Sequence, residues 1–204
     1  MRTIPFADPD GALAHLNNFK DNINHVHLVK NYQDGDTYAT VTGAKSVANI
    51  AITAPDMGIT DESGDKVLTI NGKNGLNKTQ NSDQHALGTA TAGSNTTLTD
   101  TGANFTGLEN KVVHIKAGAG AGKSAIISSV TATQLTFADI GVALDNTSEY
   151  EILDDLVVVF VDTVNEKIKL AYEETTDQAI NAAGPNSVNI GMVQQRVKVA
   201  SAAH

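Results

Sequence analysis

The sequence contains no cysteine and no tryptophan, and only 4% of its 204 residues are aromatic. Without thiols, the chain has neither a disulfide framework nor a thiolate that acts as a nucleophile or a metal ligand. Basic residues are also scarce: 14 Lys and Arg stand against 23 Asp and Glu, a formal net charge of −9. Nucleic-acid-binding domains carry basic patches, and anionic membranes attract basic segments, so this charge predicts binding to neither.

Long apolar stretches are missing as well. The longest, Leu156 to Val161, has the length of a strand, whereas a membrane-spanning helix needs about 20 residues. Residues 1–7 lack the apolar segment of a secretory signal. We therefore expect a protein with neither a membrane span nor a signal peptide.

Strand-forming and turn-forming residues dominate what is present. Thr and Val favour the half-buried surface of a sheet, while the 17 glycines and the many Asn residues favour short turns. This composition predicts an all-β fold. One helix is expected, over residues 8–24, with Asp8 as N-cap and Pro9 at its first position. Its apolar face would contain Leu13, Leu16, Phe19 and Ile23.

Period-two patterns and turn residues divide the rest of the chain into short strands. Two groups of strands are predicted around a polar, linker-like stretch at 72–85. The outer group covers 25–29, 38–42, 47–53, 66–70, 156–162, 167–172, 188–192 and 196–199, with a turn-rich stretch at 57–65. The inner group covers 96–100, 111–116, 124–130, 134–137 and 150–153.

This spacing predicts an insertion. Residues 25–85 and 154–204 would pair into one β-sandwich or barrel base domain, and residues 86–153 would form a small barrel-like β-domain inserted in it. Residues 1–24 would be an N-terminal arm followed by the short helix.

A glycine-rich stretch at 117–124 ends in Gly-Lys-Ser, like a phosphate-binding P-loop. The first glycine of that motif is missing, because Ala117 stands in its place. Residues 125–130 are also β-branched and strand-like, whereas a P-loop must open a helix. We interpret the stretch as a flexible hairpin tip that faces outward.

Two histidines, His25 and His27, share one face of a predicted strand and are spaced to meet one metal ion. A third ligand would have to be His15, His85, His114 or a carboxylate, and the spacing selects none. The acidic turns at 8–11 and 61–65 do not fit the twelve-residue calcium loop. We therefore predict no metal and no cofactor.

Enzyme signatures are similarly weak. Glycan hydrolysis needs two carboxylates facing each other across a cleft, and no Gly-x-Ser-x-Gly nucleophile elbow occurs. Sequence alone pairs none of the candidate carboxylates, which are Glu151, Asp154, Asp155, Asp162, Glu173 and Glu174. We predict that the chain is not an enzyme and has no catalytic residue.

Two stretches carry a resemblance to a known class. Residues 93–105, 111–115, 124–127 and 133–136 combine a Thr-Leu-Thr-Asp start, a strand ending in a glycine-rich tip and a Thr-x-Leu-Thr segment. This pattern resembles a small β-module of tailed-phage virion proteins, and residues 157–180 resemble hairpins of phage head-associated proteins. The resemblance implies a capsid decoration or cement protein, made in the host cytoplasm and located on the capsid exterior.

The same resemblance implies binding to the major capsid protein as a homo-oligomer, either a trimer or a dimer, and no catalytic residues. Candidate capsid contacts are apolar or basic residues of the arm and helix, namely Arg2, Ile4, Phe6, Leu13, Leu16 and Phe19. An alternative is a tail or fibre component that binds a host receptor, because the module also occurs there. A glycan depolymerase is a third possibility, and the low aromatic content argues against it.

Overall fold

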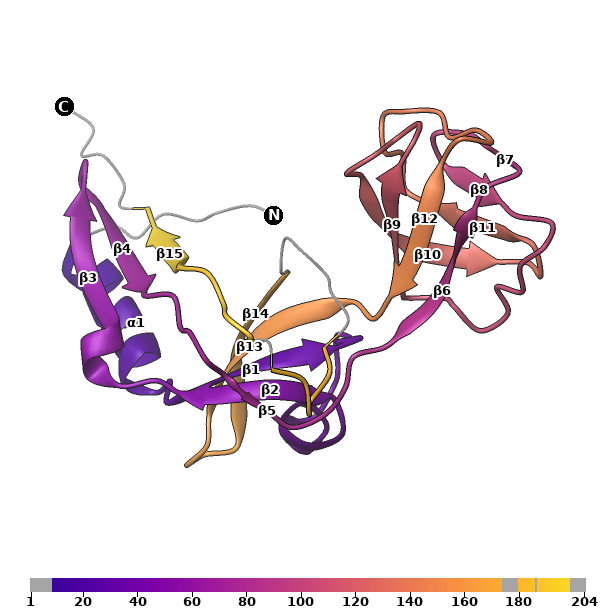
Figure 1. Cartoon of the computed structure of the whole chain (residues 1–204). Helices are drawn as coiled ribbons and strands as arrows, with labels where there is room; N and C mark the ends of the chain where they lie inside the picture. The colour runs from indigo at the N-terminus through magenta and orange to yellow at the C-terminus, as the bar shows by residue number, and fades with distance from the viewer. Residues whose placement is uncertain (1–8, 174–179, 186, 199–204) are drawn as a thin grey trace.

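The computed structural model describes residues 9–173, 180–185 and 187–198. Over these residues the chain has an all-β fold, with one α-helix, two short helical turns and three antiparallel sheets. Figure 1 shows two bodies: a base, formed by the described residues of 9–83 and 154–198, and a module, formed by residues 84–153. No helix of the described residues is long and apolar enough to cross a membrane.

The central sheet of the base contains strands that precede the module in the sequence and strands that follow it. Its order is β14 (Lys167–Glu173), β13 (Leu156–Asp162), β1 (His25–Lys30), β2 (Ser46–Ala51) and β5 (Asn77–Lys78). β1 pairs with β13 over its full length, from His25 opposite Val161 to Lys30 opposite Leu156. The flanks of residues 84–153 are therefore held in one sheet.

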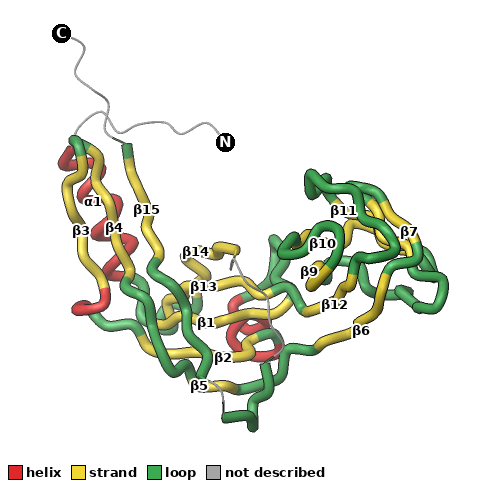
Figure 2. The backbone as a smooth tube through the Cα atoms, turned by 45° about the horizontal axis from the view of Figure 1, so that its top comes forward, coloured by secondary structure: helices red, strands yellow, loops and turns green. Residues whose placement is uncertain are grey.

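A second sheet completes the base. Its strands are β15 (Val193–Val197), β4 (Asp65–Ile70) and β3 (Met57–Glu62), and β3 follows the 3-10 turn η2 (Ala54–Asp56). Helix α1 (Pro9–Asp21) packs against β3 and β4 (Figure 2).

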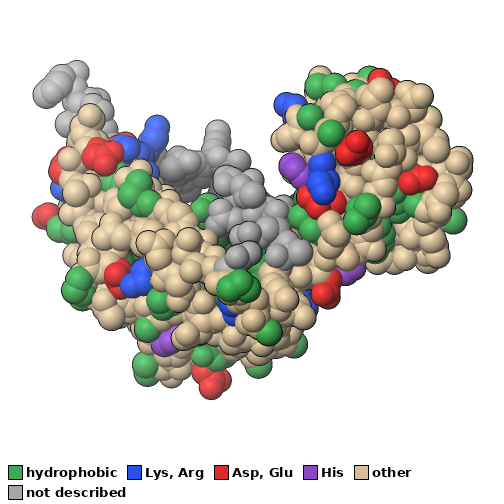
Figure 3. All heavy atoms as spheres, viewed as in Figure 1, with side chains coloured by type: hydrophobic (Ala, Val, Ile, Leu, Met, Phe, Trp, Pro, Cys, Tyr) green, Lys and Arg blue, Asp and Glu red, His purple; other side chains and the backbone are tan. Residues whose placement is uncertain are grey.

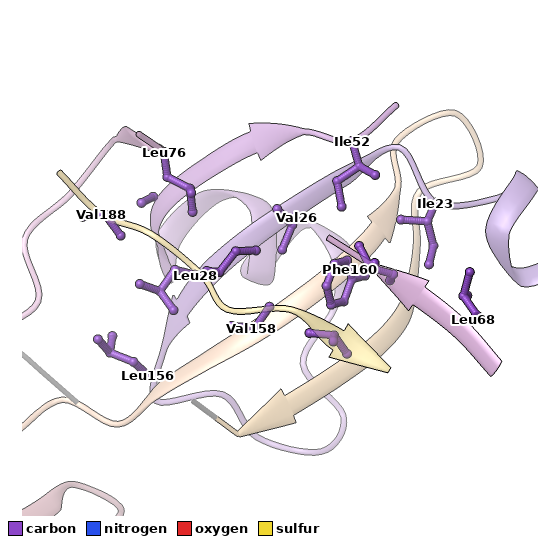
Figure 4. Close-up of a cluster of buried hydrophobic side chains, with 14 of the residues drawn as sticks. Ile23, Val26, Leu28, Ile52, Leu68, Leu76, Leu156, Val158, Phe160 and Val188 are labelled. Carbon is purple, nitrogen blue, oxygen red and sulfur yellow. The ribbon is translucent and has the colours of Figure 1, made fainter. Parts of the chain in front are cut away.

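One hydrophobic core connects the two base sheets and the helix. Figure 4 shows it with side chains from β1, β13 and β4 pointing toward one another. Its labelled members are Ile23, Val26, Leu28, Ile52, Leu68, Leu76, Leu156, Val158, Phe160 and Val188. The opposite face of the central sheet buries Val159 and Val161 beneath Val41 of the π-helical turn η1 (Thr40–Ala44). β13 is therefore buried on both faces, which explains its uninterrupted apolar run.

The module has a sheet and a core of its own. The strand order is β6 (Gln84–Thr89), β12 (Glu149–Leu153), β9 (Val112–Ala117), β10 (Ser124–Val130), β11 (Gln134–Phe137), β8 (Thr97–Thr99) and β7 (Ala92–Gly93). The pairing register shifts between Ile127 and Ser129, and buried side chains from β8, β9, β10, β11 and β12 meet in one cluster. In that cluster Phe105 packs edge-on against Tyr150, with ring centroids 5.7 Å apart.

Several segments differ from the sequence-based expectation. The predicted linker at 72–85 contains β5 and the start of β6, and the strands β6 and β7 were not predicted. Residues 38–42 are not a strand, because Thr42 Oγ1 donates to the Tyr38 carbonyl and the Lys45 amide to the Thr40 carbonyl, which closes the turn η1. Residues 57–65 are not mainly a turn, because Met57 and Ile59 turn inward in β3. Residues 188–192 are not a strand, although Ile190 forms an isolated bridge with Lys73.

The helix agrees with the predicted start at Pro9, but its buried face is shifted. Ala12 and Leu16 are fully buried, while Leu13 is 36% exposed. The predicted N-cap Asp8 lies outside the described residues. How the chain divides into folding domains stays a prediction, although the core of the module shares no residue with those of the base.

Candidate functional site

The module and the base meet at the short connection between β12 and β13. Only Asp154 and Asp155 separate β12, the last strand of the module, from β13 of the base. Both residues are buried, with 2% and 6% of their surface exposed. A buried carboxylate loses its hydration and needs nearby hydrogen-bond donors or cations in exchange. The donors around these two residues therefore show how the two bodies are joined.

Asp154 is compensated by donors from both bodies. Its Oδ1 accepts hydrogen bonds from Asn31 Nδ2 (2.8 Å) and Lys111 Nζ (2.7 Å), and it lies 2.9 Å from His85 Nε2. Its Oδ2 accepts a hydrogen bond from the Asp83 amide at 2.9 Å. Asn31 follows β1 in the base, whereas His85 and Lys111 belong to the module. We call these five residues the Asp154 cluster.

Electrostatics keep Asp154 ionised. Burial alone raises the pKa of a carboxyl group, but the hydrogen bonds from Lys111, Asn31, the Asp83 amide and His85 hold the pKa of Asp154 well below its ordinary value. The negative charge of Asp154 is thus stabilised by protein groups at the junction and not by solvent. The cluster therefore fixes the module against the base.

The base side of the cluster is held by a turn after β1. Asn31 adopts a left-handed backbone conformation, with φ of 52°, and its amide donates to the Asp155 carbonyl at 2.7 Å. Lys45 Nζ donates to the Asn31 carbonyl at 2.7 Å and pairs with Asp36, also at 2.7 Å. Asp36 therefore has a pKa below its ordinary value, because the hydrogen bonds from Lys45 and the Gln33 amide outweigh the effect of burial.

A cavity of about 370 Å³ lies beside the cluster. It is lined by residues of both bodies, which are Tyr32, Asp34, Ile126, Asp155, Val157, Ala171 and Tyr172. Ile126 comes from β10 of the module and is 46% exposed. Two of the four tyrosines in the chain therefore line one cavity at the junction.

The predicted contact residues have different environments. Arg2, Ile4 and Phe6 lie outside the described residues. Leu16 is fully buried in the base core and Phe19 packs against that core, so neither side chain forms an open surface. Leu13 is the exposed one of the three helix positions.

His25 and His27 lie on one face of β1, as expected, with ring centroids 6.3 Å apart. His27 is 5% exposed, and its Nδ1 shares a hydrogen bond of 2.8 Å with Ser46 Oγ. Burial, and secondarily the neighbouring His25, lower the pKa of His27 to about 4. Among the described residues, no three His, Asp or Glu side chains gather as metal ligands.

The glycine-rich stretch closes the hairpin between β9 and β10, and its first residues contact Thr147 and Ser148. The Ala119 amide donates to Thr147 Oγ1 at 3.2 Å, and Ser148 Oγ donates to the Ala119 carbonyl at 2.8 Å. Gly118 has a φ of 74°, and a Cβ there would lie 1.8 Å from the Thr147 carbonyl oxygen. The strand β10 follows, whereas a P-loop would open a helix here.

The remaining candidate carboxylates have local roles. Asp162 accepts hydrogen bonds from the amides of Val164 (3.0 Å) and Asn165 (3.1 Å) and so closes the turn between β13 and β14. Glu151 accepts a hydrogen bond from Gln84 Nε2 at 2.6 Å. Nothing is described for the Glu173 side chain, and Glu174 lies outside the described residues.

Comparison with known proteins gives no assignment. No protein family, curated protein or solved structure matches the chain. The Asp154 cluster and the cavity therefore have to be interpreted from their own geometry.

Sequence reasoning missed the Asp154 cluster, although one signal was present. Asp154 and Asp155 stand between two apolar strands, where carboxylates are rarely buried unless paired. Their partners lie far away in the sequence, so the spacing alone does not identify Asn31 or Lys111.

Proposed function

We propose that this chain is a non-enzymatic structural protein of a phage particle. It would bind the outer surface of the assembled capsid, contact the major capsid protein and act as a decoration or cement protein. It would do so as a homo-oligomer, either a trimer or a dimer. The mechanism is lattice linkage: a protein that binds only the assembled lattice stabilises it by mass action, and repeated binding adds avidity.

The observation that carries this proposal is the joining of two separately packed β-bodies by a buried ionic cluster. Figure 3 shows the module standing apart from the far end of the base. Asp154 bonds Asn31 of the base and Lys111 of the module, so the two bodies are held in a set orientation. A rigid two-lobed protein presents two surfaces at a fixed separation, which suits the bridging of neighbouring lattice subunits.

Two further observations support the proposal. The stretches that resemble phage virion modules lie in the module, and β13 and β14 form the hairpin of the second resemblance. These stretches are residues 93–105, 111–115, 124–127 and 133–136. The net charge of −9 favours partners with basic or neutral surfaces and disfavours nucleic acid.

The deciding measurement is the copy number of the chain in purified virions, by quantitative mass spectrometry against the major capsid protein. The proposal predicts a count in the hundreds, comparable with the capsid protein. A handful of copies would overturn it in favour of a tail or fibre component, and absence from the particle would reject both roles.

The contact surface is tested by adding purified protein to capsids that lack it and measuring occupancy. Leu13→Asp should reduce occupancy, because Leu13 is an exposed apolar side chain on α1. Val164→Asp is the matched control, since Val164 is 81% exposed but lies on the turn between β13 and β14. Removal of residues 1–7 should also reduce occupancy, and full occupancy without them would remove the arm from the contact.

A further inference from the structure

The cavity at the junction is formed by both bodies and is acidic. Asp34 and Asp155 both line it, and none of the described lining residues is Lys, Arg or His. The Asp34 side chain is exposed and makes no ion pair or hydrogen bond within the described part of the chain. Among the described lining residues no cation stands beside Asp34, so its carboxylate leaves a negative charge for a ligand to neutralise.

Aromatic rings supply the second part of the site. The rings of Tyr32 and Tyr172 line the same cavity as the two carboxylates. Tyrosine rings attract ammonium and guanidinium groups through the negative faces of their π-systems. Burial, together with Asp34 and Asp36, raises the pKa of Tyr32, which agrees with a negative field at this wall.

The shape of the site favours a polypeptide as the source of the cation. Ala171 and Tyr172 belong to β14, which is the end strand of the described central sheet. An end strand offers backbone groups to an additional extended chain. The cavity volume of about 370 Å³ lies at the lower end of ligand sites, roughly 300–1,000 Å³, and suits a single long side chain.

We propose that this cavity binds an arginine or lysine side chain of a partner polypeptide that lies in extended form along β14. The carboxylates of Asp34 and Asp155 neutralise the cation, the tyrosine rings pack against it, and Ile126 and Val157 contact the aliphatic part of its stem. Because the lining comes from both bodies, the Asp154 cluster is what assembles the site.

The test uses the full-length purified chain and three capped peptides of sequence Val-X-Val, with X as arginine, citrulline or glutamate. Citrulline keeps the shape of arginine without its charge. Binding is followed by NMR through the methyl groups of Ile126, Val157 and Ala171. We expect saturable shifts with the arginine peptide, weakened at high salt, and affinity for the citrulline peptide at least tenfold lower.

Variants localise the binding. Asp34→Asn should lower the affinity for the arginine peptide roughly 3- to 10-fold, since one charge contact at a partly exposed site is removed. Glu109→Gln is the control, because Glu109 is an exposed acidic residue of the module that does not line the cavity, and its loss should change affinity less than twofold.

Equal binding of the arginine and citrulline peptides, or shifts confined to residues outside the cavity, would overturn the proposal. Saturable shifts of the same methyl groups with a neutral oligosaccharide, and none with the arginine peptide, would also overturn it and assign the cavity to a sugar. The test needs no virion, so its outcome is independent of the copy-number measurement that decides the proposed function.

Discussion

Asn31 and Asp154, which are 123 positions apart in the sequence, are joined by a hydrogen bond of 2.8 Å at the point where the two bodies meet. The same carboxylate holds Lys111, so one side chain bonds both sides of the junction. The Asp154 side chain therefore links the module to the base directly.

Asp154→Asn should destabilise the chain by about 3 kcal/mol, because it leaves Lys111 near a buried site without its counter-charge. Urea unfolding at neutral pH measures the change. Asp21→Asn serves as control: Asp21 is 64% exposed and pairs with Lys20 at the surface, so its loss should change stability by less than about 0.5 kcal/mol. Equal effects of the two substitutions would contradict the assigned role of the cluster.

Combining Asp154→Asn with Lys111→Met tests whether the two residues act through each other. The pair should show a coupling free energy of about 1–3 kcal/mol, because each substitution removes the same ion pair. Additive changes in the unfolding free energy would show that Lys111 and Asp154 stabilise the chain independently.

The module should be separable from the base. Gln84 and Leu153 stand opposite each other in the pairing of β6 with β12, so residues 84–153 begin and end at one place. We expect a protein of residues 84–153 to unfold cooperatively, since it contains a complete core. A variant chain in which a short Gly-Ser linker replaces residues 84–153 should still form the two sheets of the base. A collapsed amide NMR spectrum of the isolated module would contradict this.

Lowering the pH should reduce the stability of the base, the body that contains His27, before the carboxylates become protonated. The pKa of His27 is about 4 in the folded chain and 6.5 in the reference state, so the unfolded chain binds the proton first as pH falls. Stability should be full above pH 6.5 and decline by up to about 3 kcal/mol toward pH 4. Urea unfolding across this range measures the decline.

His27→Gln should flatten the pH dependence in that window, because glutamine keeps a hydrogen-bonding group for Ser46 but does not titrate. His114→Gln is the matched control and should leave the decline caused by His27 in place. An unchanged slope in the His27 variant would show that another group causes the acid sensitivity.

Two glycines of the β9–β10 hairpin should respond differently to alanine. Gly122 has a φ of 79° with open space around it, so Gly122→Ala should cost about 1–2 kcal/mol for the left-handed backbone alone. Gly118→Ala adds a collision with the Thr147 carbonyl and should cost about 3 kcal/mol or more. Thermal unfolding of both variants distinguishes them, and equal losses would place Thr147 farther from this turn.

Local patterns predicted the parts of the fold that depend on local chemistry. The apolar run from Leu156 to Val161 indicated a strand and forms most of β13, and Pro9 marked the first residue of α1. The all-β class followed from composition. These features depend on neighbouring residues, which a single sequence displays.

The rest depended on partners distant in the sequence or on side-chain hydrogen bonds. The stretch from Thr40 to Ala44 is rich in β-branched residues, yet threonine hydroxyls bond to nearby backbone groups and close it into a turn. The strand β3 was hidden among turn residues and is fixed by its pairing with β4. The cavity combines Tyr32, Ile126 and Tyr172, which no spacing rule connects.

The entry point of the module also determines how the protein responds to mechanical force. The Asp154 amide donates to the Asp83 carbonyl at 3.1 Å, and the Asp154 carboxylate accepts from the Asp83 amide. Tension along the chain through the base can pass across this short contact without stretching the seven strands beyond it. If the contact breaks, β6 and β12 separate from one end, one residue pair at a time, and the module extends. In the proposed role at a capsid surface, the chain would lengthen under load only after this contact has broken.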